Sequence, residues 1–140
     1  MYEARIWNIQ ERLGSWGILL KLLDTELVLP LFVHNKPEAL AILSGTYSHD
    51  SIYNAFLTLA LNQKLFLKEI VLSTLINTEV YAEVIFCGEQ IANPLNIKLS
   101  VSDALALNTL TTEQCRILVV DNIVTKLALP EDLVMAELSE

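Results

Sequence analysis

The chain has 140 residues, of which 53 % are apolar and 19 % charged, and it carries a formal net charge of −8. A chain of this length has room for one ordinary domain, which cannot easily bury so much apolar surface by itself. The composition therefore predicts an aliphatic core together with an apolar face that a second subunit covers, and so a homo-oligomer.

The apolar runs are too short for membrane spans. The longest, Leu27 to Val33 and Ile117 to Val120, fall far short of the roughly 20 residues that a spanning helix requires. Glu3 and Arg5 precede any apolar run, so no signal peptide is evident. We therefore expect no membrane partner and a cytoplasmic location.

The charge distribution bears on nucleic acid as a partner. Four acidic residues follow Pro130 with no base among them, so the rest of the chain carries about −4. Phosphate backbones bind mainly to Lys and Arg, and the nine basic residues here are spread singly from Arg5 to Lys126. Tight non-specific binding is not expected, although a small basic cleft could still accept a nucleic-acid substrate.

Three apolar runs near the N-terminus predict an antiparallel meander. Tyr2 to Gln10 mixes aromatic and β-branched residues, Ile18 to Leu23 gives a second run, and Leu27 to Val33 gives a third. The Gly and Ser residues within 14–17 predict a turn between the first two strands. Pro30 predicts an edge position or a bulge in the third, because proline lacks the backbone N–H.

The hydrophobic pattern then changes to a helical period. Asn35 can cap a first helix, with Glu38 three residues later in the capping-box position and Gly45 at its end. A second helix is predicted over residues 48–60, where apolar residues fall at helical spacing.

The C-terminal half predicts strands again, followed by a third helix. Alternation places Val80, Ala82, Val84 and Phe86 on one face of a strand that follows a tight turn at Asn77-Thr78. The predicted elements are strands at 70–75, 79–87, 94–99 and 116–120, a helix from Ser100 or Ser102 to Leu107, and one or two helical turns at 121–126.

These elements predict an α+β fold: an antiparallel or mixed sheet of about six to seven strands with three helices, in a single domain. We expect that domain to span residues 1–128, with an acidic C-terminal tail or peripheral helix over residues 129–140.

Several short motifs follow one another along the chain. They are Leu29-Pro30-Leu31-Phe32-Val33 leading into Glu38-Ala39-Leu40-Ala41-Ile42, then Ser48-His49-Asp50, Val80-Tyr81-Ala82, Ser102-Asp103-Ala104-Leu105-Ala106-Leu107 and Arg116-Ile117-Leu118-Val119-Val120. In order and spacing they resemble the bifunctional nuclease family, long catalogued as a domain of unknown function. The Ser-His-Asp piece is similar to that family's Thr-His-Asp-Leu entry to a helix, and the Ser-Asp piece to its Ser-Asp-Ala-Ile-Ala-Leu signature.

The resemblance implies a mixed α/β domain, a homo-oligomer and an activity on DNA and RNA that some members are reported to have. The chain departs from the family at three places: Ser100-Val101 stands where Arg-Pro is usual, Thr74 where Asp is frequent, and Asn77-Thr78 where Asp-Gly is common. The lost Arg removes a bidentate binder of phosphate or carboxylate. The lost Asp removes a potential metal ligand.

The resemblance also implies a candidate catalytic set. Metal-assisted cleavage of a phosphodiester needs hard oxygen ligands that hold Mg²⁺ or Mn²⁺. The residues matched to family motifs are Glu38, His49, Asp50 and Asp103, of which Asp50 and Asp103 are the predicted metal ligands and His49 a proton shuttle. All four lie at predicted helix starts, where capping and the helix dipole give the carboxylates a structural role instead.

Two functions follow as alternatives. The first is metal-dependent hydrolysis of DNA or RNA, with no organic cofactor, because the sequence contains no Gly-rich phosphate loop. The second is a non-catalytic homo-oligomeric interaction module that kept the fold and lost the site.

Overall fold

The structure, a computed structural model, describes residues 1–12, 15–33, 37, 40–41, 62, 65–77, 79–89, 91–110 and 115–138. Within these residues the chain forms a single α+β domain, as predicted, with eight strands in one sheet and three helices. In chain order the elements are β1 (Tyr2–Arg12), β2 (Ser15–Leu22), β3 (Leu27–Val33), β4 (Phe66–Ile76), β5 (Glu79–Cys87), β6 (Leu95–Ser100), α3 (Val101–Leu110), β7 (Arg116–Val119), α4 (Asp121–Leu127), β8 (Leu129–Pro130) and α5 (Glu131–Leu138).

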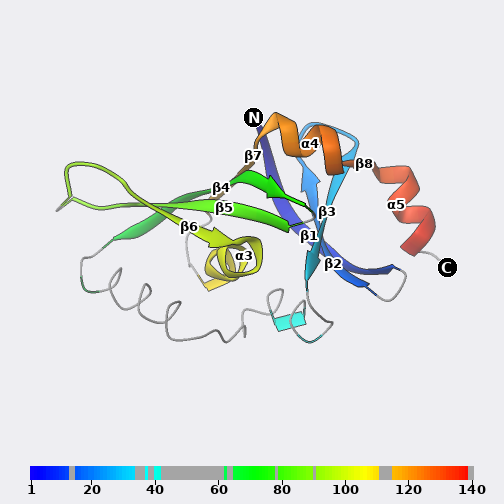
Figure 1. Cartoon of the computed structure of the whole chain (residues 1–140), viewed down its shortest axis with the longest axis horizontal. Helices are drawn as coiled ribbons and strands as arrows, with labels where there is room; N and C mark the ends of the chain where they lie inside the picture. Colours follow the sequence, from blue (N-terminus) through cyan, green and yellow to red (C-terminus); the bar gives the residue numbers. More distant parts are fainter. Residues whose placement is uncertain are drawn as a thin grey trace.

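The sheet consists of two antiparallel meanders joined by one strand. The strand order is β6-β5-β4-β7-β1-β2-β3-β8, and every pair is antiparallel except β4 with β7. Figure 1 shows β4, β5 and β6 running along the long axis of the molecule while β1, β2 and β3 cross it steeply, which is the accumulated twist of a large sheet. The strand count exceeds the prediction by the two-residue β8, which is too short to leave a sequence pattern.

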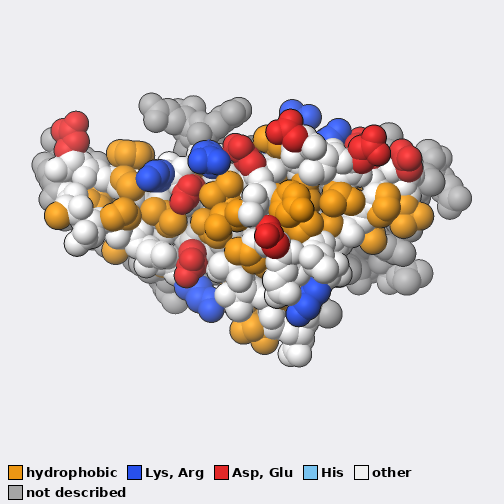
Figure 2. Space-filling model, turned by 90° about the horizontal axis from the view of Figure 1, so that it is seen from above, with side chains coloured by type: hydrophobic (Ala, Val, Ile, Leu, Met, Phe, Trp, Pro, Cys, Tyr) orange, Lys and Arg blue, Asp and Glu red, His pale blue; other side chains and the backbone are white. Residues whose placement is uncertain are grey.

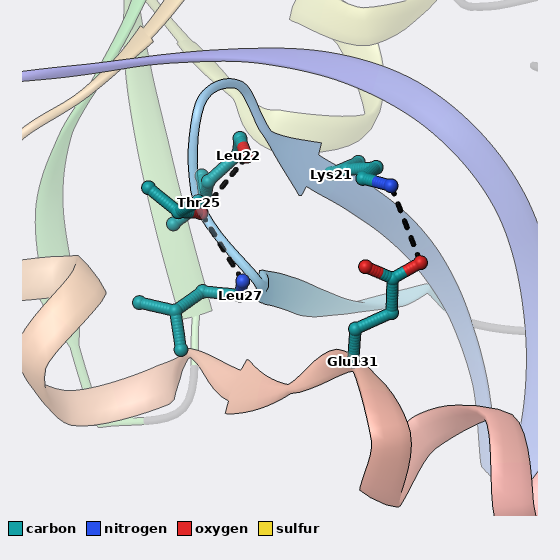
Figure 3. Close-up of polar contacts among 5 residues, drawn as sticks. All are labelled: Lys21, Leu22, Thr25, Leu27 and Glu131. Carbon is teal, nitrogen blue, oxygen red and sulfur yellow. Dashed lines mark hydrogen bonds and ion pairs between the residues drawn. The ribbon is translucent and has the colours of Figure 1, made fainter.

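Two tight turns use residues that tolerate a left-handed backbone. Asn77 has φ 57° between β4 and β5, and Asp24 has φ 63° between β2 and β3. In the second turn the Thr25 hydroxyl donates to the carbonyl oxygen of Leu22 (2.9 Å) and accepts from the N–H of Leu27 (3.1 Å; Figure 3). The turn at Asn77 was predicted from its polar residues.

The predicted turn at residues 14–17 was wrong in its extent, because Ser15 and Gly17 belong to strand β2. A Cβ on Gly17 would stand 3.1 Å from the carbonyl oxygen of Leu31, so glycine is used here for the close approach of β3. The predicted edge position of Pro30 is confirmed. Pro30 pairs with Leu19 of β2 on one side, and on its other side the β3–β8 ladder has already ended at Val28.

The main hydrophobic core lies on one side of the sheet, which we call the inner face. Helix α3 packs there against β4, β5 and β6, and Ala104, Leu105 and Ala106 are fully buried. Helix α4 adds Ile123 to the same core. The predicted alternation of β5 is confirmed, since Val80, Ala82, Val84 and Phe86 all face this core.

Helix α5 covers part of the opposite side, the outer face. Val134 packs with Leu19 and Val28 in a second, smaller cluster. The N–H of Glu131 donates to the carbonyl oxygen of Glu26 (2.7 Å), and the Glu131 carboxylate accepts from Lys21 Nζ (3.2 Å; Figure 3). The segment after residue 128 thus adds a strand and a helix to the sheet.

The first two predicted helices lie almost wholly outside the described residues; Pro37, Leu40 and Ala41, from the first, are helical. Among the described helices, none has the length and apolarity needed to cross a membrane.

Candidate functional site

Three hydroxyl side chains form a row across β4, β5 and β6 on the outer face. Tyr81 on β5 pairs with Thr74 on β4 and with Ser100 on β6. The Thr74 and Ser100 positions are those where the bifunctional nuclease resemblance leads one to expect Asp and Arg. The fold therefore brings both departures to one place, at the end of the β4–β5 hairpin.

An open cavity of about 340 Å³ adjoins this row, where β6 leads into α3 (Figure 1). It is lined by Ile76, Tyr81, Lys98, Leu99 and Ser100, so its wall is mainly apolar, with one ammonium group and two hydroxyl groups. Its volume is near the lower limit of small-molecule pockets, which begin at about 300 Å³.

The polar groups of this pocket are arranged around Tyr81. Its hydroxyl donates to Glu79 Oε2 (2.8 Å), and Lys98 Nζ lies 5.8 Å from the centre of its ring. The hydrogen bond to Glu79, together with the charge of that carboxylate, raises the pKa of Tyr81. The phenol therefore stays protonated at neutral pH and acts as a donor, and the ammonium of Lys98 rests on the ring face.

Asp103 stands in the first turn of α3, as predicted. Its backbone N–H approaches the Ser100 hydroxyl oxygen (3.4 Å), so Ser100 fills the position of a capping residue at the helix start. A carboxylate in this turn also interacts favourably with the helix dipole. Both features give Ser100 and Asp103 a structural role in holding α3 next to the pocket.

The remaining predicted site residues, Glu38, His49 and Asp50, lie outside the described residues. Within the described ranges, no three His, Cys, Asp or Glu side chains gather closely enough to hold a metal ion. The hydroxyl of Ser100, which lies 3.4 Å from the Asp103 backbone nitrogen, is a weaker ligand for Mg²⁺ or Mn²⁺ than a carboxylate is. The described residues alone therefore do not fit a metal centre, and the predicted Asp50–Asp103 pair stays a prediction.

Cys115 lacks the character of a nucleophile. Cys87 and Cys115 are half-buried and are not joined in a disulfide. Burial raises the pKa of the Cys115 thiol to about 11, against a smaller lowering by a backbone hydrogen bond, so this thiol is protonated at neutral pH.

The outer face of β4, β5 and β7 carries apolar side chains that belong to neither hydrophobic cluster. Figure 2, seen from above, shows hydrophobic groups following one another along the long axis with charged groups on both sides. By strand register, the apolar side chains on the outer face of β4, β5 and β7 are those of Phe66, Val71, Ile76, Tyr81, Ile85, Cys87 and Leu118, which we call the outer apolar band.

Sequence reasoning missed the pocket and the band. No site was predicted at Lys98 or Ile76. The alternation of β6 turns Ile97 and Leu99 inward and Lys98 outward. An outward-facing lysine close to the start of a helix could have indicated a polar site there.

Comparison with known proteins adds no identification. No protein-family model matches the sequence, and no curated protein shows significant similarity to it.

Proposed function

We propose that the chain is a non-catalytic homo-oligomeric interaction module built on a fold that resembles the bifunctional nuclease domain. The observation that carries the proposal is the row of Thr74, Tyr81 and Ser100, which are in register and all bear neutral hydroxyls. Nuclease chemistry at this row would need a carboxylate for a metal and a guanidinium for a phosphate. Thr74 and Ser100 thus lack the metal-binding carboxylate and the phosphate-binding guanidinium that the resemblance implies at their positions, although Glu79 and Lys98 stand beside Tyr81.

The outer apolar band supports the assembly part of the proposal. Phe66 and Ile76 are 53 % and 52 % exposed, and Ile85 and Leu118 are half-buried. Large apolar side chains that gather on one face, outside the core, are typical of surfaces that another protein covers. We also propose a cytoplasmic location, where Cys87 and Cys115, which form no disulfide, would remain reduced.

The test combines solution mass with a cleavage assay. The purified chain should sediment as a multiple of 15.7 kDa at micromolar concentration and should leave single- and double-stranded DNA and RNA intact with Mg²⁺ or Mn²⁺. A strictly monomeric protein, or one that cleaves through its own residues, would overturn the proposal.

The second candidate, a metal-dependent nuclease, is favoured by one observation. Asp103 lies on the first turn of α3, beside a pocket that already contains an ammonium group and two hydroxyls. If Asp50 reached the same place, the two carboxylates would be available to hold Mg²⁺ or Mn²⁺, with Glu38 and His49 nearby.

The matched variant for this candidate is Asp50→Ala/Asp103→Ala, purified in parallel with the parent. Cleavage by the parent that vanishes in a folded double variant would establish the nuclease. Equal cleavage by both would indicate a contaminant. A metal-dependent rise in the melting temperature of the parent, absent from the variant, would report ion binding independently of substrate.

A further inference from the structure

We infer that the outer face of strands β4 to β7 docks onto the same face of a second copy of the chain. This inference rests on the proposed function, since it names the surface through which the module would assemble. It commits to a two-fold, face-to-face contact in which the outer apolar bands of both copies meet.

The charge of this face favours a second copy of the chain as its partner, in preference to a strongly charged molecule. On the outer face of β4 to β7, strand register places two bases, Lys98 and Arg116, and three acids, Glu69, Glu79 and Glu83, which leaves a net charge of −1. The whole chain has nine bases and seventeen acids. Two copies with a net charge of −8 each would repel through most surfaces, whereas this face carries a net charge of only −1 from its strands.

The charges also alternate locally. Glu83 is the cross-strand neighbour of Lys98, Glu69 is the neighbour of Arg116, and Arg116 Nε also lies 3.7 Å from Glu3 Oε1. Both bases of β4 to β7 therefore stand next to an acid, and Glu79 is the one further acid. A nucleic acid or a strongly basic protein would find no matching field here, whereas an identical face presents both signs in nearly equal numbers.

The size of the face suits a stable dimer. Strands β6, β5, β4 and β7 have 6, 9, 11 and 4 residues. At about 3.3 Å per residue and about 4.8 Å between strands, their flat footprint is on the order of 500 Å² per copy, and corrugated side chains expose more area than their footprint. Standard interfaces bury about 800 Å² per partner.

The proposed contact has its two-fold axis across the strands. Phe66 and its partner Cys87 lie at one end of the β4–β5 hairpin, and the pocket lined by Ile76, Tyr81 and Ser100 lies at the other. A two-fold axis that runs in the plane of the interface and crosses the strands exchanges these ends. It therefore brings the exposed Phe66 of each copy toward the apolar pocket of its partner, and aromatic side chains in such pockets contribute much of the energy of an interface.

The first experiment measures the mass of the parent and four variants of the whole chain by sedimentation equilibrium. The parent is expected to be a dimer, and Phe66→Glu and Ile85→Glu should each weaken dimerisation by at least about tenfold. The control is Leu95→Glu, since Leu95 is 36 % exposed but pairs with Phe86 and so belongs to the inner side of β6. Ile85→Thr keeps a β-branched side chain at this position and therefore controls for a loss of strand stability that is unrelated to dimerisation.

A cross-link tests the orientation. In a Cys115→Ser background, Ile76→Cys introduces a thiol about ten strand residues, or roughly 30 Å, from Cys87 of the same chain. A short bis-maleimide can therefore join these two positions only between copies. We expect a covalent dimer with Ile76→Cys, and none when Cys87→Ser is added.

The outcomes separate the inference from the proposed function. A dimeric parent whose outer-face variants match Leu95→Glu in mass overturns the inference and leaves the interaction module intact. A monomeric parent overturns both. An odd number of subunits, or a dimer without the cross-link, refutes the two-fold arrangement.

Discussion

Removing the buried contact of helix α5 should destabilise the domain measurably. Val134 is 1 % exposed and packs with Leu19 and Val28, so Val134→Ala deletes two buried methyl groups. At about 0.8 kcal/mol each the loss is about 1.6 kcal/mol, and the residual cavity adds to it. The better helix propensity of alanine returns about 0.5 kcal/mol. We expect the free energy of unfolding to fall by about 1.5 kcal/mol.

The matched control is the neighbouring residue, Leu133, which is 49 % exposed on the same helix. Leu133→Ala should change the free energy of unfolding by no more than about 0.5 kcal/mol. Urea unfolding followed by far-ultraviolet circular dichroism, at one protein concentration, measures both variants. If Val134→Ala matched the parent, α5 would open independently of the sheet. If both variants lost the same amount, Val134 would have no special burial.

Three further predictions concern single groups. Glu79→Gln should lower the pKa of Tyr81 toward that of an ordinary phenol, as followed by ultraviolet absorbance; an unchanged titration would mean that the hydrogen bond between them is not formed. The Cys115 thiol keeps its proton until about pH 11 in the folded state, against an ordinary value of 9.0, so stability should fall as pH rises through this interval. Cys115→Ala should flatten that slope relative to the parent, and parallel slopes would contradict the burial. Gly17→Ala should destabilise the fold by about 1 kcal/mol, because the new Cβ meets the backbone oxygen of Leu31; a gain in melting temperature would refute this.

Local patterns predicted most of the strands and the start of helix α3. The alternation through Val80 and Phe86 identified β5 and its buried face, because a strand repeats every two residues. The Ser100–Asp103 segment identified the start of α3, because capping chemistry is encoded within one turn. Such signals need no knowledge of distant parts of the chain.

Contacts between distant segments were not predictable in the same way. Lys21 and Glu131 form a hydrogen bond although 110 residues separate them in the sequence, and no local pattern near either residue predicts this contact. The row of Thr74, Tyr81 and Ser100 depends on strand register, which shifts between Leu72 and Thr74. Each residue had been noted, but their alignment required the bulge that the sequence does not reveal.

Strand β7 has a consequence for how the chain folds. Its four residues are the sole link in the described sheet between the β1–β3 meander and the β4–β6 meander, with Ile117 pairing to both Ala4 and Ile70. During synthesis both meanders can form from neighbouring hairpins, but they cannot join until residues 116–119 have left the ribosome. Such late, non-local closure is slow, and it leaves the facing edges of β1 and β4 unpaired in the meantime. The nascent domain is therefore most exposed to edge-to-edge misassociation in the interval just before residues 116–119 emerge.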